Sequence, residues 1–500
     1  MRRGVARHGT MLRRSLVAAL LVAGLAPSLA IESEGALQPC RVGGVVHELR
    51  CGTLTRPLDP ANLSGATIEI GYVVAPAVAR QKLADPVFVL AGGPGQSAVS
   101  VAPTMLALLS RTRNRRDIVF VDQRGTGRSA PLDCEDPTQE TLAEQSEPDR
   151  QLQQVLACKA RLLKRRYLPN EAALGFFTTA VAVQDLDAVR QALGAPRVNL
   201  VGASYGTRVA LEYARQFPTS LRRAVLDGVA PPDMALPASY STDGQAAFDA
   251  LLAACADEPT CATAYPTLRA DWRTLLGSLP RKVSAAHPLT GAVETFTLTR
   301  AMVLAAVRAP LYVPSLAAGL PAAIADAAQG RYEGLFGLQA MLQARPANRV
   351  ALGMHLSVVC AEDLPRLTQS SDRPGAEFGR DDARLYARLC SVWPRGAVPK
   401  GFDAISRTRA PMLLLSGGLD PATPPRHGAR VAALLGGKAR HVVVPNAGHG
   451  VMAVGCMRDV VQRFIDAVDD AAALAVDADC AAAIPRPPAF RPLRSGAAPG

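Results

Sequence analysis

The chain has 500 residues, of which 49% are hydrophobic and 20% charged, so it can form a sizeable core and exceeds the usual length of one domain. Its formal net charge is +12, but the basic residues are mostly dispersed among acids, and no basic patch is interleaved with aromatic residues. This pattern excludes nucleic acid as an expected partner.

The first 30 residues have the pattern of a secretory signal peptide. Five arginines lie within the first 14 residues, an apolar run covers residues 16–25, and small residues occupy positions 28 and 30. The apolar run is short for a membrane span, and no second one follows it. We therefore expect residues 1–30 to be removed and the protein to be exported, to the periplasm or the medium. The alternative, a retained membrane anchor, is less well supported.

All ten cysteines lie beyond this segment. Export places them in an oxidising compartment, where thiols pair. Many connectivities are possible, and sequence proximity favours Cys40–Cys51, Cys134–Cys158, Cys255–Cys261, Cys360–Cys390 and Cys456–Cys480. Because the sequence contains no CxxC and no Cys/His cluster at metal-ligand spacing, we expect no metal site.

Short apolar runs that end at turn residues predict the strands. Each is continuous and not alternating, which is typical of strands covered on both faces of a parallel sheet. In chain order they cover residues 87–90, 118–121, 198–201, 224–226, 412–415 and 442–444.

Helical patterns over residues 179–193 and 205–217 lie between these runs, so the strands and helices alternate. The fold class is therefore α/β, with a mostly parallel, doubly wound sheet. We expect the core to be formed by residues 31–230 and 401–485, interrupted by a large, mainly helical cap at 231–400. The proline-rich end, residues 486–500, is expected to be flexible.

A G-x-S-x-G motif at residues 202–206 follows the strand at 198–201 and opens a helix. Small residues on both sides of Ser204 permit the strained turn that exposes a nucleophilic hydroxyl. We therefore predict Ser204 as a nucleophile.

A serine nucleophile needs a base and an acid that orients it. His449 lies in a glycine-containing loop after the last predicted strand, and Asp420 follows the strand before it, so the order Ser-Asp-His is that of a known catalytic arrangement. His427 is the competing base and Asp227 the competing acid.

An oxyanion intermediate needs two backbone N–H donors. Tyr205, directly after the nucleophile, should provide one of them. The second should come from the glycine-rich loop after residues 87–90, where Gly93 is favoured over Gly92.

Together these motifs resemble the proline iminopeptidases and secreted tripeptidyl aminopeptidases, which have the α/β-hydrolase fold. The matching segments are GGPG at 92–95, DQRGTGRS at 122–129, GASYGT at 202–207, SGGLDPATP at 416–424 and GHG at 448–450. The chain departs from the family at Ala91, where the family often has histidine.

The resemblance implies a serine aminopeptidase that releases short N-terminal units from peptides and needs no cofactor. It also implies that cap acids bind the substrate's ammonium, which here points to Glu362 and then Asp363, in the segment CAED. Peptides or small esters are the expected partners of a monomer. A carboxylesterase with the same triad is the first alternative, and a non-catalytic binding protein on this scaffold is the second.

Overall fold

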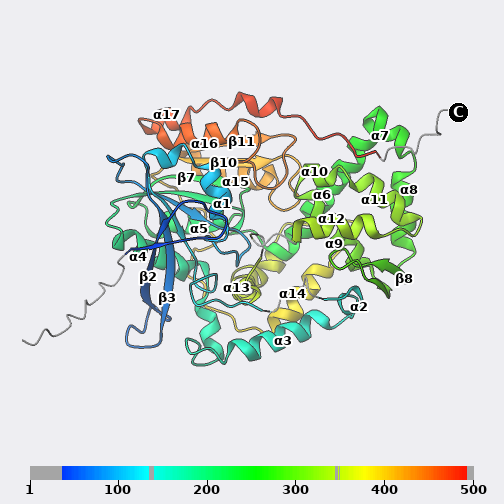
Figure 1. Ribbon diagram of the computed structural model, residues 1–500, viewed down its shortest axis with the longest axis horizontal. Helices are drawn as coiled ribbons and strands as arrows, with labels where there is room; N and C mark the ends of the chain where they lie inside the picture. The colour runs from blue at the N-terminus through cyan, green and yellow to red at the C-terminus, as the bar shows by residue number, and fades with distance from the viewer. Residues whose placement is uncertain (1–36, 135–139, 344–346, 348, 492–500) are drawn as a thin grey trace, which may run out of the picture. The chain divides into compact units, whose positions relative to one another are not determined.

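The computed structural model describes residues 37–134, 140–343, 347 and 349–491 (Figure 1). The predicted signal peptide, residues 1–30, lies outside this part of the chain. Among the described helices, none combines the length and apolarity that a membrane span requires.

A nine-stranded sheet has the order β1-β2-β3-β5-β4-β6-β7-β10-β11. From β1 to β5 neighbouring strands are antiparallel, and from β5 to β11 they are parallel. Each of the six predicted strand segments lies within one of these strands, and the α/β class is confirmed. The strands are β1 (Gln38–Cys40), β2 (Leu49–Pro57), β3 (Thr67–Ala75), β4 (Val87–Leu90), β5 (Ile118–Val121), β6 (Val198–Ala203), β7 (Leu221–Asp227), β10 (Met412–Gly417) and β11 (Ala439–Val444).

Both faces of this sheet are covered. On β4, Phe88 and Leu90 belong to one apolar cluster, whereas Val87 and Val89 belong to another, because successive side chains of a strand point to opposite faces. Helices on either side of the sheet contribute residues to these clusters. They include α4 (Thr179–Ala192), α5 (Tyr205–Gln216) and α15 (Pro425–Leu435) on one face, and α1 (Ala102–Leu108) and α16 (Met457–Asp466) on the other.

The segment between β7 and β10 is mainly helical and has an apolar core of its own (green and yellow-green in Figure 1). It also contains a two-stranded antiparallel sheet that the sequence analysis did not predict. The elements of its first part are α6 (Leu236–Asp257), α7 (Pro259–Ala264), α8 (Leu268–Gly277), β8 (Arg281–Ala286), β9 (Val293–Leu298), α9 (Arg300–Leu311), α10 (Pro314–Ala317), α11 (Leu320–Ala328) and α12 (Glu333–Gln343).

The later part of this segment packs differently. It contains α13 (Leu352–Val358), a π-helical turn at Val359–Asp363 and α14 (Asp381–Ser391). Met354, Leu356 and Cys360 join the apolar cluster of β4, β6 and α5, so they extend the core of the sheet. Conversely, Leu142 of α2 (Leu142–Gln145) joins the cap's own core, and its N–H donates to Glu294 of β9. The cap therefore draws on a segment that precedes the predicted boundary at residue 231.

All ten cysteines are paired. The five pairs are the local ones favoured by sequence proximity: Cys40–Cys51, Cys134–Cys158, Cys255–Cys261, Cys360–Cys390 and Cys456–Cys480. Cys360–Cys390 joins the turn after α13 to α14 and so fixes the later part of the cap.

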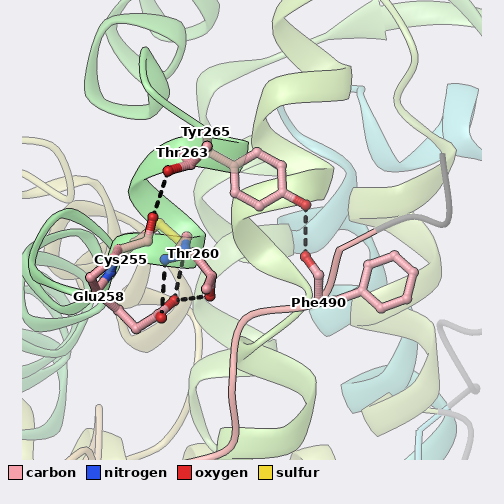
Figure 2. The surroundings of a disulfide bond; sticks show 8 residues. Cys255, Glu258, Thr260, Thr263, Tyr265 and Phe490 are labelled. Atoms are coloured by element: carbon pink, nitrogen blue, oxygen red, sulfur yellow. Dashed lines mark hydrogen bonds between the residues drawn. A yellow bond between two sulfur atoms is a disulfide. The ribbon is translucent and has the colours of Figure 1, made fainter.

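Part of the chain beyond Ile484 contacts the cap. Phe490 donates its N–H to the carbonyl of Ala318, and its carbonyl accepts a hydrogen bond from the Tyr265 hydroxyl, near the Cys255–Cys261 disulfide (Figure 2). Phe490 therefore has backbone partners in the cap, which the prediction of a flexible tail at 486–500 did not include. Residues 492–500 lie outside the described part.

Candidate active site

Ser204 lies on a strained turn between β6 and α5. Its φ is +54° and its ψ is −123°, a conformation that residues with a side chain rarely adopt. A Cβ atom at Gly202 would lie 2.4 Å from the carbonyl oxygen of Gly206, and one at Gly206 would lie 2.2 Å from that of Leu90. Both glycines of the motif are therefore required, because backbone segments pass too closely for any side chain.

His449 and Asp420 form a buried pair. His449 Nδ1 lies 2.8 Å from Asp420 Oδ2, and the other oxygen of Asp420 accepts hydrogen bonds from the N–H groups of Ala422 and Thr423. Asp420 is 2% exposed. The carboxylate thus fixes the orientation of the imidazole and leaves Nε2 as the nitrogen that can take a proton.

Ser204 and His449 lie at the same end of β6 and β7. The Ser204 N–H donates to the carbonyl of Asp227, and a Cβ atom at the next residue, Gly228, would lie 3.2 Å from His449 Cε1. No hydrogen bond joins Ser204 Oγ to His449 among the described residues. Such a bond is often long in an enzyme without substrate and shortens in the complex.

The pair shifts both pKa values. Burial would lower the pKa of His449, but Asp420 outweighs burial and raises this pKa above 6.5. Burial would raise the pKa of Asp420, but His449 and the hydrogen bonds from residues 422 and 423 lower it. Asp420 therefore stays ionised while His449 titrates.

The raised pKa of His449 gives a pH prediction. Only neutral imidazole can accept a proton, so kcat/KM should fall as the pH decreases through this pKa, and the acid limb should have its midpoint above pH 6.5. A pH–rate profile on a neutral substrate measures this midpoint. A midpoint below pH 6.5 would contradict the assignment of His449 as the base.

The two competing residues have other partners. Both carboxylate oxygens of Asp227 accept the N–H of Val451, and one also accepts that of Met452, so Asp227 holds the loop after His449. His427 is buried at the start of α15, where its Nε2 lies 2.8 Å from Asp243 of α6. The structure thus favours Asp420 over Asp227 and His449 over His427.

The geometry also separates the two predicted glycine donors. The N–H of Gly92 donates to Gln96 Oε1 at 3.0 Å, so it is not free to bind an oxyanion. The N–H groups of Gly93 and Tyr205 donate no hydrogen bond within the described residues, and Tyr205 opens helix α5, where N–H groups have no helical partner. This corrects the inclusion of Gly92, and Gly93 and Tyr205 stay the predicted donors.

Thr423 is a site residue that the sequence analysis missed. Its hydroxyl donates to Asp420 Oδ2 at 2.7 Å and lies 3.1 Å from His449 Nδ1. The signal was its position three residues after Asp420, which allows a local hydrogen bond between the two side chains. We expect Thr423→Val, which keeps the shape, to lower kcat/KM about tenfold by loosening the pair. Unchanged kinetics would show that the hydroxyl is dispensable.

The two cap acids are not free to bind an ammonium. Glu362 is 2% exposed, and its two oxygens accept hydrogen bonds from the N–H and hydroxyl of Thr179. Asp363 is fully buried, and Arg208 of α5 binds both of its oxygens at 2.9 and 3.0 Å. The assignment of Glu362 and Asp363 to the substrate's amine is corrected accordingly: they fasten the cap to α4 and α5.

Glu362 also supports the turn at the nucleophile. The Thr179 hydroxyl donates a hydrogen bond to Glu362 and lies 2.6 Å from the hydroxyl of Tyr205, the residue after Ser204. Burial raises the pKa of Glu362 to about 7 despite the nearby charge of Arg208. The chain Glu362–Thr179–Tyr205 therefore links the cap to the nucleophile turn.

The buried ion pair predicts a large stability effect. Arg208→Met would remove the cation that binds both oxygens of Asp363 and leave Arg366, 3.7 Å away, as its nearby cation, which we expect to cost about 3–5 kcal/mol of unfolding free energy. Arg384→Met on α14 removes an exposed pair with Asp381 and should cost at most about 1 kcal/mol. Denaturant titration of both variants measures the difference, and equal losses would contradict the role of Arg208.

The DQRGTGRS motif has a structural role. Asp122 accepts hydrogen bonds from the Ser97 hydroxyl and from the N–H groups of Val99 and Arg128, which ties two loops together. Arg124 is buried and binds both oxygens of Asp185 on α4. The motif thus holds the segment that directly follows the glycine-rich loop. In the described chain, no group of three or more acid, histidine or cysteine side chains could hold a metal ion.

Comparison with known proteins agrees with this geometry. Residues 85–254 match the family described as alpha/beta hydrolase fold, and residues 376–471 match the family described as TAP-like protein. The sheet order and the match of residues 85–254 show that the chain has the α/β-hydrolase fold. Its C-terminal part is similar to TAP-like proteins, in line with the predicted resemblance to tripeptidyl aminopeptidases.

Three curated relatives illustrate this similarity. The chain is 30% identical over 229 residues to the putative hydrolase YuaR of Escherichia coli (strain K12), covering 43% of this chain and 44% of that protein. It is 31% identical over 198 residues to a tripeptidyl aminopeptidase of Streptomyces lividans, covering 37% and 36%. It is 24% identical over 428 residues to the serine protease Hip1 of Mycobacterium tuberculosis (strain ATCC 25618 / H37Rv), covering 77% and 79%. The first two matches span less than half of each relative.

Proposed function

We propose that the protein is a serine hydrolase that acts through an acyl-enzyme. Ser204 attacks the substrate carbonyl while His449 takes its proton, and Asp420 holds the imidazole. The N–H groups of Tyr205 and Gly93 stabilise the oxyanion. His449 then gives the proton to the leaving group, and water releases the acyl unit from Ser204. The observation that carries this proposal is the strained turn at Ser204 beside the buried His449–Asp420 pair.

The substrate class that we propose is peptides with a free N-terminus, from which short N-terminal units are released. The TAP-like match and the tripeptidyl aminopeptidase relative support this choice. Glu362 and Asp363 do not support this substrate class, because other residues of the protein already bind both side chains. Selectivity for substrates with a free amine is therefore the decisive test. Esters are the alternative substrates, because the same three side chains can cleave them.

Matched chromogenic peptide amides with free and acetylated N-termini test the proposal. We expect cleavage of the free peptides and at least a tenfold lower kcat/KM for the acetylated ones, since an aminopeptidase must bind the ammonium. Equal cleavage of both forms would indicate an endopeptidase. Absent amide cleavage together with Ser204-dependent ester hydrolysis would indicate a carboxylesterase.

We further propose that the protein works as an exported monomer. Its five disulfide bonds fit folding in an oxidising compartment. Sequencing the N-terminus of protein recovered from periplasmic and medium fractions tests removal of residues 1–30 and separates the two locations. Light scattering during size-exclusion chromatography tests the monomer.

A further inference from the structure

Arg308 is a cap side chain that the proposed reaction does not use. It lies on α9, with its guanidinium carbon 4.1 Å from the ring centroid of Tyr240 and 5.6 Å from that of Tyr312. Its Nη2 donates to the Tyr312 hydroxyl at 3.2 Å. The two rings thus hold the guanidinium in one place.

The hydrogen-bonding capacity of Arg308 is mostly unused. A guanidinium has five N–H donors, but the Tyr312 hydroxyl is its one hydrogen-bond acceptor within the described residues. Its Nε is buried without a partner, and no acid of the described chain lies within 4.0 Å of it. Asp382 on α14 is a nearby acid whose charge acts on Arg308, but it lies beyond ion-pair distance. The residue as a whole is partly exposed, although its Nε is buried.

Arg308 lies on the side of the site that His449 occupies. The ring of Tyr312 packs edge-on against the ring of His449, with centroids 5.1 Å apart and planes at 75°. The Tyr312 carbonyl accepts the N–H of His449 at 2.9 Å. The positive charge of Arg308 also acts on His449 and tends to lower its pKa. Tyr312 is therefore the shared neighbour of the guanidinium and the imidazole.

Another cap contact extends this cluster to the opposite side of the site. His355 Nδ1 lies 3.2 Å from the carbonyl of Pro94 in the glycine-rich loop, and its Nε2 lies 2.7 Å from the Tyr386 hydroxyl. The charges of Arg308 and Asp382 both act on the pKa values of Tyr386 and Tyr240. The cap side chains around Arg308 therefore reach from the base to the oxyanion loop.

We propose that Arg308 binds a carboxylate on the leaving part of the substrate. His449 donates its proton to the leaving amine, so the leaving part lies on the side of His449 and Tyr312. A guanidinium binds a carboxylate through two parallel hydrogen bonds, and here the ligand would satisfy donors that the protein leaves free. This inference rests on the proposed peptidase function and makes short peptides, whose C-terminal carboxylate lies near the scissile bond, the favoured substrates.

The test compares peptides that differ in one group. Alanine peptides of three to five residues with a free N-terminus are used with either a C-terminal carboxylate or a carboxamide, and product release is followed by mass spectrometry. For the best length we expect kcat/KM to be roughly tenfold to a hundredfold higher for the carboxylate, the effect of a charge-assisted hydrogen bond. Arg308→Met should abolish this preference and Arg308→Lys should keep part of it. Arg300→Met on the same helix, where Arg300 binds the carbonyl of Glu377, should leave it intact.

A structural role of Arg308 would lower activity equally on both forms, so the ratio is the decisive quantity. A wild-type ratio near one at every length, or an unchanged ratio in Arg308→Met, would overturn the proposal. If Arg308→Met does not fold, the carboxylate-to-carboxamide ratios of kcat/KM for the wild type and for Arg308→Lys still test the proposal. The same peptides are also tested as inhibitors of Ser204-dependent ester hydrolysis. If no peptide is cleaved, the aminopeptidase proposal fails, whereas an Arg308-dependent preference in the inhibition constants would still support the carboxylate site.

Discussion

Ser204→Ala is expected to lower kcat by about 10⁴- to 10⁶-fold, because the proposed acyl-enzyme forms on the Ser204 hydroxyl. Alanine has the same Cβ atom as serine and can adopt the same φ of +54° at the same cost, so the fold should be unaffected. Initial rates on a chromogenic ester and a peptide amide, together with thermal unfolding, measure both effects.

Two controls make this result specific. Ser64→Ala, in an exposed turn, should keep full activity. Binding of a peptide to Ser204→Ala should persist, since the oxyanion donors Tyr205 and Gly93 are backbone groups. Residual activity above about one per cent of wild type would exceed the expected loss and would assign the chemistry to another residue.

Asp420→Asn is expected to lower kcat by about 10³- to 10⁴-fold, the range known for the equivalent change in serine proteases. An asparagine amide can no longer stabilise the charged imidazole and can fix the wrong tautomer of His449. The acid limb of the pH profile should also move to lower pH, because Asp420 is the main group that raises the pKa of His449. Steady-state rates across the pH range measure both changes.

Asp227→Asn is the matched control for this variant. Asp227 contributes a smaller increase to the pKa of His449, but its hydrogen bonds go to the backbone of Val451 and Met452. Its loss should reduce stability more than catalysis. A larger fall in kcat for Asp227→Asn than for Asp420→Asn would reverse the assignment of the orienting acid.

The sheet and the main site residues could be predicted because their signals are local. Runs such as residues 87–90 and 118–121 are apolar throughout because both faces of their strands are covered. Ser204 is marked by Gly202 and Gly206, whose absence of side chains the turn requires. The order of Asp420 and His449 along the chain follows from the order of the strands that carry them.

The partners of charged cap residues could not be predicted from the sequence. The segment CAED identifies two acids, but only the packing of the cap on α5 gives Asp363 its partner Arg208. The same holds for Gly92, whose N–H is bound by the side chain of Gln96 four residues later. In each case the pattern identified the residue type, and tertiary contacts decided its role.

The C-terminal end of the chain shows a second limit of prediction from the sequence. A proline-rich composition after Ile484 is typical of a flexible tail, yet Phe490 pairs with Ala318 and Tyr265 of the cap. The β8–β9 hairpin was missed because its strands, residues 281–286 and 293–298, alternate between buried and exposed residues inside a mainly helical segment. Composition alone does not identify such contacts.

Covalent labelling with a fluorophosphonate probe tests the account most directly. The probe reacts with an activated serine, and intact mass followed by peptide mapping locates the adduct. The account predicts one adduct per chain, on Ser204, with labelling that is lost in Ser204→Ala and much slower in Asp420→Asn. An unlabelled protein, or an adduct on any other serine, would contradict it.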